Sequence, residues 1–459
     1  MNLKQLFAPS DMTEGSISKK IVLFAIPMLI GNIAQQLYST VDSIVVGKYV
    51  GDNALAAVGS SSPIYNLLLV LFIGISVGVG IMVSQYHGAK KKEELSKTIG
   101  SCITLTAIAT AVLMLTGMVV IRPMLELLKT PESIIDWCQS YLTILLIGIG
   151  GTAYYNIFSG ILRGLGDSVS ALIYLLVATV INIVLDIYFV AEMNMGVAGV
   201  AWATIIAQTV SAVLCLLKLL KMREMFELKP SLLIPDKYQS LTLMRLGLPS
   251  GLTQAIMSMA MIMVQSLTNS FGEALIAANV IVMRVDGFAM MPNFSFGNAM
   301  TTFAGQNVGA GKYDRVEKGS KQGTLISVAV STTITLLILV FGDLLMYAFT
   351  DTAELVQLSM KMMRILAAGY IAVAVTQALS GIMRGAGDTM TPMWISIITT
   401  VITRVPLAYA LVALTKSEAN PSGAPESIFV SLLISWLLGA LLTFVAYRKG
   451  TWKTKALKK

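Results

Sequence analysis

Long apolar segments constrain the fold of this chain more than any other feature. The hydrocarbon core of a bilayer is about 30 Å thick, so a helix needs about 20 mostly apolar residues to cross it. Twelve segments meet this requirement: 21–45, 54–83, 98–121, 138–160, 169–190, 197–219, 241–266, 276–302, 323–346, 362–382, 391–414 and 428–447. Because unpaired backbone groups are costly in lipid, each segment is predicted to be a helix. The sequence therefore predicts an all-α integral membrane protein with twelve transmembrane helices.

The composition agrees with a membrane protein and excludes several other classes. Mean hydropathy is +0.76 and 13% of the residues are charged, whereas soluble domains carry about 25% charged residues. The single histidine, His87, excludes histidine-rich zinc clusters and histidine-dependent triads. The chain also lacks a convergent catalytic set and a nucleotide-binding loop. We expect no enzyme activity, no cofactor and no nucleic-acid partner; the expected partners are the bilayer and small organic substrates.

Lys and Arg residues are distributed unevenly between the two sides of the predicted membrane plan. With a cytoplasmic N-terminus, the inner segments hold 25 of the 33 basic residues, the outer segments hold six, and Arg284 and Arg404 fall within spans. Cytoplasmic segments are enriched in Lys and Arg, so this bias predicts that both termini are cytoplasmic. We expect a monomer in the cytoplasmic (inner) membrane of a bacterium.

Two segments of the chain repeat one another. Residues 159–168 match residues 380–389 at seven of ten positions, at an offset of 221, and both carry an Arg-Gly-x-Gly-Asp block. The same offset pairs Gln85 with Gln306 and Lys91 with Lys312. Each half therefore contains six spans, and an even number keeps the two halves in the same orientation.

The repeat predicts how the chain is organised and favours a transport function. We predict a first lobe at 1–220, a basic cytoplasmic linker at 221–240 and a second lobe at 241–459. Two parallel six-helix lobes that face a common cavity are suited to alternating access. The alternatives are a duplicated scaffold without a transport role and a pure channel.

Polar residues on two of the predicted spans form helical stripes that end in carboxylates. The first span carries Asn32, Gln35, Ser39 and Asp42, at spacings of three and four residues, and the fifth carries Thr179, Asn182 and Asp186. Such spacing places side chains on one helical face. Counting 1.5 Å per residue puts Asp42, Asp186 and Thr204 at similar depths in the outer half of the membrane. These oxygens could together bind Na⁺ or a proton; the alternative for the acids is an interfacial position near the outer water.

Several motifs in both halves resemble the multidrug and toxic compound extrusion (MATE) family. They are Pro27, Val41–Gly47, the segment from Gly51 to Ala57, Gln85–Ala89 and both Arg-Gly-x-Gly-Asp blocks. The resemblance implies a V-shaped pair of lobes and export of organic, often cationic, compounds against H⁺ or Na⁺. It also implies a cation-coupling site in the first lobe at Asp42, Asn156, Asn182, Asp186 and Thr204, and a helix bend at Pro27.

The second half does not repeat the acidic residues. At the offset of 221, Asp42 corresponds to Met263 and Asp186 to Leu407. The predicted cavity candidates in this half are Arg284, Asp286, Met257 and Met261, and those on the first span are Asn32, Gln35 and Ser39. Arg284 and Asp286 are two residues apart and so do not face each other on a helix; a structural ion pair across helices and plain packing of the methionines are the alternatives.

These observations together predict a secondary antiporter. We expect it to export varied organic compounds against H⁺ or Na⁺. A lipid-linked oligosaccharide flippase of related fold is the alternative function; it requires a more cationic cavity than Arg284 and Arg404 provide.

Overall fold

Helices make up nearly all of the computed structural model, which describes residues 9–128, 130–418 and 421–457. No β-strand occurs in these ranges. Eleven of the described helices are long and apolar enough to cross a membrane, and a bent pair supplies a twelfth span. The prediction of an all-α membrane protein is confirmed. Of the counted basic residues, Lys4, Lys129, Lys458 and Lys459 lie outside the described ranges.

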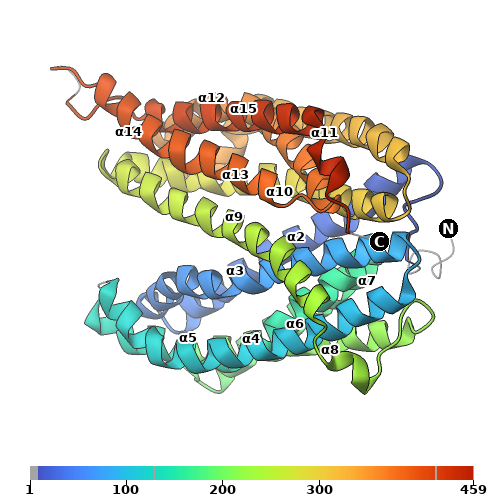
Figure 1. The fold of residues 1–459 in the computed structure, drawn as a ribbon. Coiled ribbons are helices and arrows are strands. Elements are labelled where there is room, and N and C mark those ends of the chain that lie inside the picture. The colour runs from blue at the N-terminus through green and yellow to red at the C-terminus, as the bar shows by residue number, and fades with distance from the viewer. Residues whose placement is uncertain (1–8, 129, 419–420, 458–459) are drawn as a thin grey trace. The chain divides into compact units, whose positions relative to one another are not determined.

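The first half of the chain contains six of these spans, drawn from blue to green in Figure 1. They are α2 (Ile17–Tyr49), α3 (Asp52–Gly88), α4 (Lys92–Leu127), the pair α5 (Glu132–Ile147) and α6 (Ile149–Gly164), α7 (Ser168–Asp186) with the π-helix η1 (Ile187–Glu192), and α8 (Gly196–Lys221). A short 3₁₀ helix, η2 (Pro230–Leu233), follows. Pro27 lies inside α2, which continues through it as one helix; the bend there stays a prediction.

The second half contains the other six spans, drawn from yellow-green to red in Figure 1. They are α9 (Lys237–Asn269), α10 (Glu273–Gly309), α11 (Tyr313–Tyr347), α12 (Ala353–Gly385), the run of α13 (Met390–Ser396), π-helix η3 (Ile397–Arg404) and α14 (Val405–Leu414), and α15 (Glu426–Lys449). The 3₁₀ helix η4 (Thr451–Thr454) follows α15.

The fourth predicted span, 138–160, is a broken helix. The axes of α5 and α6 differ by 50°, and Gly148 stands between them. A Cβ atom at Gly148 would lie 2.3 Å from Cβ of Ile205 on α8. Glycine therefore lets α8 pack directly against the break.

By their internal contacts, the residues group into two compact units. The first comprises residues up to Asp11 and 26–251, and the second comprises 12–25 and 252–459. Helix α2 therefore begins in the second unit and continues in the first, and α9 begins in the first unit and continues in the second. The linker at 221–240 and the V-shaped cavity stay predictions.

Small residues bring helices together in the first unit. Helix α6 packs against α3 and α8, and a Cβ atom at Gly160 would lie 2.5 Å from the Ser76 hydroxyl oxygen on α3. Ser76 uses that hydroxyl to donate to the backbone oxygen of Asn156 at 2.6 Å. In lipid, such close packing and interhelical hydrogen bonds are the main source of helix association.

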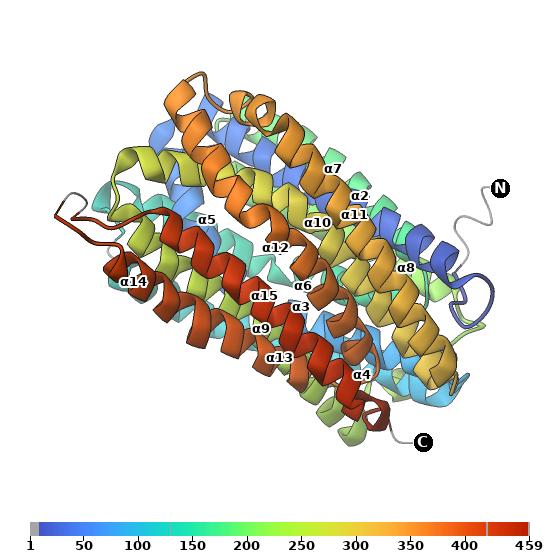
Figure 2. The same cartoon turned by 90° about the horizontal axis from the view of Figure 1, so that it is seen from above.

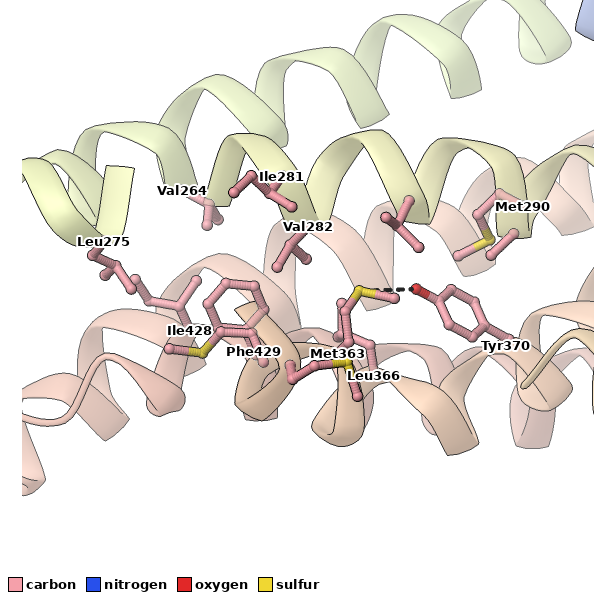
Figure 3. Close-up of a cluster of buried hydrophobic side chains, with 14 of the residues drawn as sticks. Val264, Leu275, Ile281, Val282, Met290, Met363, Leu366, Tyr370, Ile428 and Phe429 are labelled. Carbon is pink, nitrogen blue, oxygen red and sulfur yellow. Dashed lines mark hydrogen bonds between the residues drawn. The ribbon is translucent and has the colours of Figure 1, made fainter. Parts of the chain in front are cut away.

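Helix α12 is the centre of the second unit. It packs against α10, α11 and α15, and the two views of the ribbon show α12 and α15 side by side (Figures 1 and 2). Figure 3 shows the core between these helices, where Val282, Leu366, Tyr370 and Phe429 are all buried.

Candidate functional site

Helices α2 and α7 bring the two predicted carboxylates of the first unit together. Asp42 is 7% exposed, and Asn182 and Asp186 are fully buried. The amide nitrogen of Asn182 faces both acids and donates to Oδ1 of Asp42 at 2.9 Å and to Oδ2 of Asp186 at 3.2 Å. The opposite amide orientation would set an acceptor against two acceptors. Asn182 therefore bridges the two carboxylates.

The two carboxylates also lie within hydrogen-bonding reach of each other. Two carboxylates in contact repel one another unless a proton or a cation lies between them. A shared proton or a bound cation would each relieve the repulsion between Asp42 and Asp186.

Two oxygen atoms of the site have no hydrogen-bond partner. Oδ1 of Asp186 and Oγ1 of Thr204 are buried and unpartnered. Most buried polar atoms in proteins have a partner, so each exception calls for an explanation. Thr204 lies on α8; the hydroxyl of Tyr38 on α2 approaches its side chain without reaching hydrogen-bond geometry, and Tyr38 also interacts electrostatically with Asp42. An ion that binds between these side chains would satisfy both oxygens.

Two tyrosine hydroxyls border the acids. Tyr38 and Tyr141 both lie near enough to Asp42 and Asp186 to interact with them electrostatically. Tyr141 is 7% exposed and lies on α5. Sequence reasoning did not single out Tyr141, although a tyrosine within an apolar span is a signal that could have identified it.

Asn156 makes its contacts elsewhere. Its amide nitrogen donates to the backbone oxygen of Thr152 at 2.8 Å, one turn earlier on α6. Its own backbone oxygen accepts from Ser76 and Ser159. The structure thus brings Asn156 together with α3, and its membership of the acidic cluster stays a prediction.

The other polar residues of α2 are more accessible than Asp42. Gln35 and Ser39 are exposed and Asn32 is half-buried. The Ser39 hydroxyl donates to the backbone oxygen of Gln35 at 3.3 Å. The stripe therefore runs from accessible polar groups to a buried carboxylate.

The second unit contains no copy of this arrangement among its described residues. Thr403, which corresponds to Asn182, donates to the backbone oxygen of Ile398 at 2.9 Å within the π-helix η3. Of the cavity candidates, Met261 and Arg284 are exposed, and Met257 and Asp286 are half-buried.

The donor set fits an ion that binds to oxygen. No group of three or more His, Cys, Asp and Glu side chains in the described part of the chain is placed to bind a metal. Two carboxylates with amide and hydroxyl groups instead supply hard oxygen ligands, which suit Na⁺ or H⁺.

The chain is similar to a known protein family and to several of its members. A family model described as MatE matches residues 27–188 and again residues 249–410, which agrees with the internal repeat. The chain is 30% identical over 451 residues to "Probable multidrug resistance protein YoeA" of Bacillus subtilis (strain 168), and the match covers 96% of each chain. It is 25% identical over 446 residues to "Probable multidrug resistance protein NorM" of Thermotoga maritima, covering 96% of this chain and 94% of that relative.

A solved structure has the same fold. A MATE crystal structure in complex with MaL6 has a TM-score of 0.89 and 24% identity to this chain, and the match covers 96% of this chain and 97% of the other. The fold and the repeat define a multi-pass membrane transporter of two related halves. More specifically, the chain belongs to the MATE family.

Proposed function

We propose that this protein is an antiporter that exports varied organic compounds against an inward flow of Na⁺ or H⁺. The observation that carries the proposal is the bridge from Asn182 to Asp42 and Asp186. Ionisable residues within membrane spans are costly and are functional candidates by default. Relatives that match nearly the whole chain are named probable multidrug resistance proteins, which supports the export of organic compounds.

The acidic cluster supplies the exchange step. An ion between Asp42 and Asp186 neutralises their repulsion, and its release restores it. Asn182 holds the two acids at a fixed separation in both states, because its amide contacts both. The unpartnered oxygens of Asp186 and Thr204 favour Na⁺, which takes several oxygen ligands, although a proton could also be held by the acids.

Helix α2 supplies a connection between the site and the second unit. It carries Asp42, and its first turns, up to Ala25, belong to the second unit. Pro27 lies just past this boundary and removes one backbone hydrogen bond from the helix. We infer that α2 bends at Pro27 as the site exchanges its ion, and that this movement accompanies alternating access.

The membrane orientation is part of the same proposal. The excess of Lys and Arg on one side supports cytoplasmic termini in the inner membrane of a bacterium. A monomer contains the entire acidic cluster, since α2, α7 and α8 of one chain supply Asp42, Asn182, Asp186 and Thr204.

Transport in reconstituted vesicles tests the proposal. Protein in proteoliposomes is given a Na⁺ gradient or a pH gradient separately, and movement of a fluorescent organic cation is followed. We expect one gradient to drive transport and Asp42→Asn to abolish the gradient dependence. The matched control is Asp52→Asn, an exposed acid of the same unit. Wild-type coupling in Asp42→Asn would contradict the assigned role.

A further inference from the structure

A cavity with an excess of positive charge lies in the second unit, where α10 is followed by α11. Its volume is about 390 Å³, and the charged side chains that line it are Lys312, Arg315, Lys318 and Asp314. Ligand pockets commonly have volumes of about 300–1,000 Å³. Three cations and one acid leave the lining positive, and a concave surface with one sign of charge concentrates ions of the opposite sign. The cavity is therefore a candidate site for an anion.

The corresponding lysine of the first unit is neutralised, whereas Lys318 is not. At the offset of 221, Lys318 corresponds to Lys97, whose Nζ lies 2.7 Å from Oε1 of Glu93 in an ion pair. Asp314 stands at the place of Glu93. No ion pair joins Asp314 to Lys318 in the part of the chain that the structure describes. The charge of Lys318 is thus available to a ligand.

The acid that precedes Lys318 on α11 is engaged elsewhere. Glu317 forms an ion pair with Lys453, which follows α15. The repeat also differs in sign at one position, because Arg315 stands where the first unit has Glu94. The excess of positive charge is therefore a feature of the second unit that the first unit does not share.

Two of the cations are held in place before any ligand binds. Nε of Arg315 donates to the backbone oxygen of Met12 at 3.2 Å, and its Nη2 donates to that of Glu14 at 3.0 Å. Nζ of Lys312 donates to the backbone oxygen of Thr13 at 3.0 Å. These carbonyl groups fix the two side chains but carry no net charge that would cancel theirs. Groups that are already ordered lose less entropy on binding.

The cavity lies at the level of the lipid headgroups. Lys318 stands five residues before the apolar segment of α11, and Ile17, which also lines the cavity, stands four residues before that of α2. At 1.5 Å per residue, these positions lie about 6–8 Å outside the apolar core, and the headgroup layer on each side of a bilayer is about 5–8 Å thick. Tyr313 is a further lining residue, and tyrosines are enriched at the membrane interface.

An apolar face of α11 continues from the cavity into the membrane. Leu325, Leu336 and Val340 are 70%, 56% and 70% exposed, and they follow Lys318 by seven, eighteen and twenty-two residues. At 3.6 residues per turn, the four side chains lie within about 60° of one another around the helix. The buried side of α11 packs against α10 and α12. An acyl chain can therefore lie along this face while its headgroup occupies the cavity.

We propose that the cavity binds the phosphate headgroup of an anionic phospholipid. Lys312, Arg315 and Lys318 surround the phosphate, and the acyl chains lie along the exposed apolar face of α11. In the proposed orientation, the lipid belongs to the cytoplasmic leaflet, whose anionic headgroups bind basic pockets beside transmembrane helices. A free phosphate ion has a similar charge but gains nothing from the apolar face. The inference does not depend on the proposed export function.

Two phospholipids with identical acyl chains test this assignment. The full-length protein in detergent is stripped of lipid and titrated with dioleoyl phosphatidylglycerol, which is anionic, or with dioleoyl phosphatidylcholine, which has no net charge. Native mass spectrometry measures the bound lipid. We expect the anionic lipid to bind roughly ten-fold more tightly. Inorganic phosphate in large excess should not displace it, and displacement would overturn the lipid assignment in favour of a free anion.

A pair of double variants locates the bound lipid. Lys312→Gln combined with Lys318→Gln should raise the Kd of phosphatidylglycerol roughly ten-fold or more and leave that of phosphatidylcholine unchanged. The matched control is Lys91→Gln combined with Lys97→Gln, the corresponding residues of the first unit. It removes the same charge from the chain and should keep the preference for the anionic lipid.

Two further variants separate the charge of the cavity from its structural role. Lys312→Arg combined with Lys318→Arg retains both charges and should keep the preference. Should the glutamine double variant fail to fold by gel filtration, Lys318→Gln alone leaves the contact between Lys312 and Thr13 intact and should raise the Kd roughly five-fold. The proposal is overturned if the wild-type protein binds both lipids equally, or if the Lys91 and Lys97 control loses as much preference as the cavity variant.

Discussion

Asp42 on α2 and Asn182 on α7 are joined by a hydrogen bond of 2.9 Å, and the same amide nitrogen reaches Asp186 at 3.2 Å. One uncharged side chain thus holds two acids in place inside a membrane protein. Without this amide donor, the two carboxylates would repel each other and move apart.

Removing the bridge should weaken both stability and coupling. We expect Asn182→Ala to lower the free energy of unfolding by about 1–3 kcal/mol, because it leaves buried acceptors without their donor. Gradient-driven transport should fall at least ten-fold. Thermal unfolding in detergent and vesicle transport measure the two effects. Asn53→Ala, an exposed asparagine of the same unit, is the control, and an Asn182 variant that behaves like it would rule out the bridging role.

A substitution at Thr204 should show whether the site binds Na⁺ or H⁺. Its hydroxyl oxygen is buried without a partner, and Thr204→Val removes that oxygen while keeping the shape of the side chain. We expect NaCl to stabilise the wild-type protein against heat more than choline chloride does, through binding to the folded state. The variant should lose most of this difference.

The control for Thr204 lies on the same helix. The Thr209 hydroxyl donates to the backbone oxygen of Ile205 at 2.6 Å, so Thr209→Val should keep the Na⁺ effect. Identical Na⁺ stabilisation of the wild-type protein and Thr204→Val would show that Thr204 is not an ion ligand. A wild-type protein that NaCl stabilises no more than choline chloride does would favour H⁺ as the coupling ion.

Helix α3 and the beginning of α9 should tolerate no added methyl group at their contact. A Cβ atom at Gly74 would lie 2.6 Å from the backbone oxygen of Gly247. Because that neighbour is backbone, the helices must separate, and we expect Gly74→Ala to cost about 1–3 kcal/mol of stability. Gly59→Ala on the same helix meets nothing within 4 Å. Thermal unfolding of the two variants should differ clearly, and equal midpoints would contradict the packing described.

Much of this fold could be predicted from the sequence, because lipid imposes a simple length rule on helices. The spacing of Asn182 and Asp186, and the depth of Asp42, likewise follow from helical geometry. The functional roles of these residues stay predictions.

Other features depend on tertiary packing and carry no local signal. The break at Gly148 arises where Ile205 packs against the chain, and hydropathy does not detect it. Hydropathy likewise does not detect the π-helix that ends at Arg404 or the contacts that Asn156 makes with α3 and within α6. Helix α3 also extends beyond its predicted span, from Asp52 to Gly88, because polar residues can continue a helix outside the apolar core.

The start of α11 should determine how firmly the segment before α2 is held in the second unit. Nε of Arg315 donates to the backbone oxygen of Met12 at 3.2 Å, and Nη2 donates to that of Glu14 at 3.0 Å. Gln306, which corresponds to Gln85 in the repeat, accepts from the backbone nitrogen of Met12 at 2.9 Å. In the second half, the repeated glutamine therefore binds the backbone of the segment that precedes α2.

We expect Arg315→Gln to release this segment without unfolding the protein. Hydrogen bonds from a charged donor contribute about 1.5–3 kcal/mol, so local opening and amide exchange should rise roughly ten-fold or more. Hydrogen-exchange mass spectrometry of a peptide covering residues 9–20 measures this. Lys318→Gln, an exposed cation one turn further along α11, is the matched control. Equal exchange in the two variants would show that the contacts of Arg315 do not hold the segment.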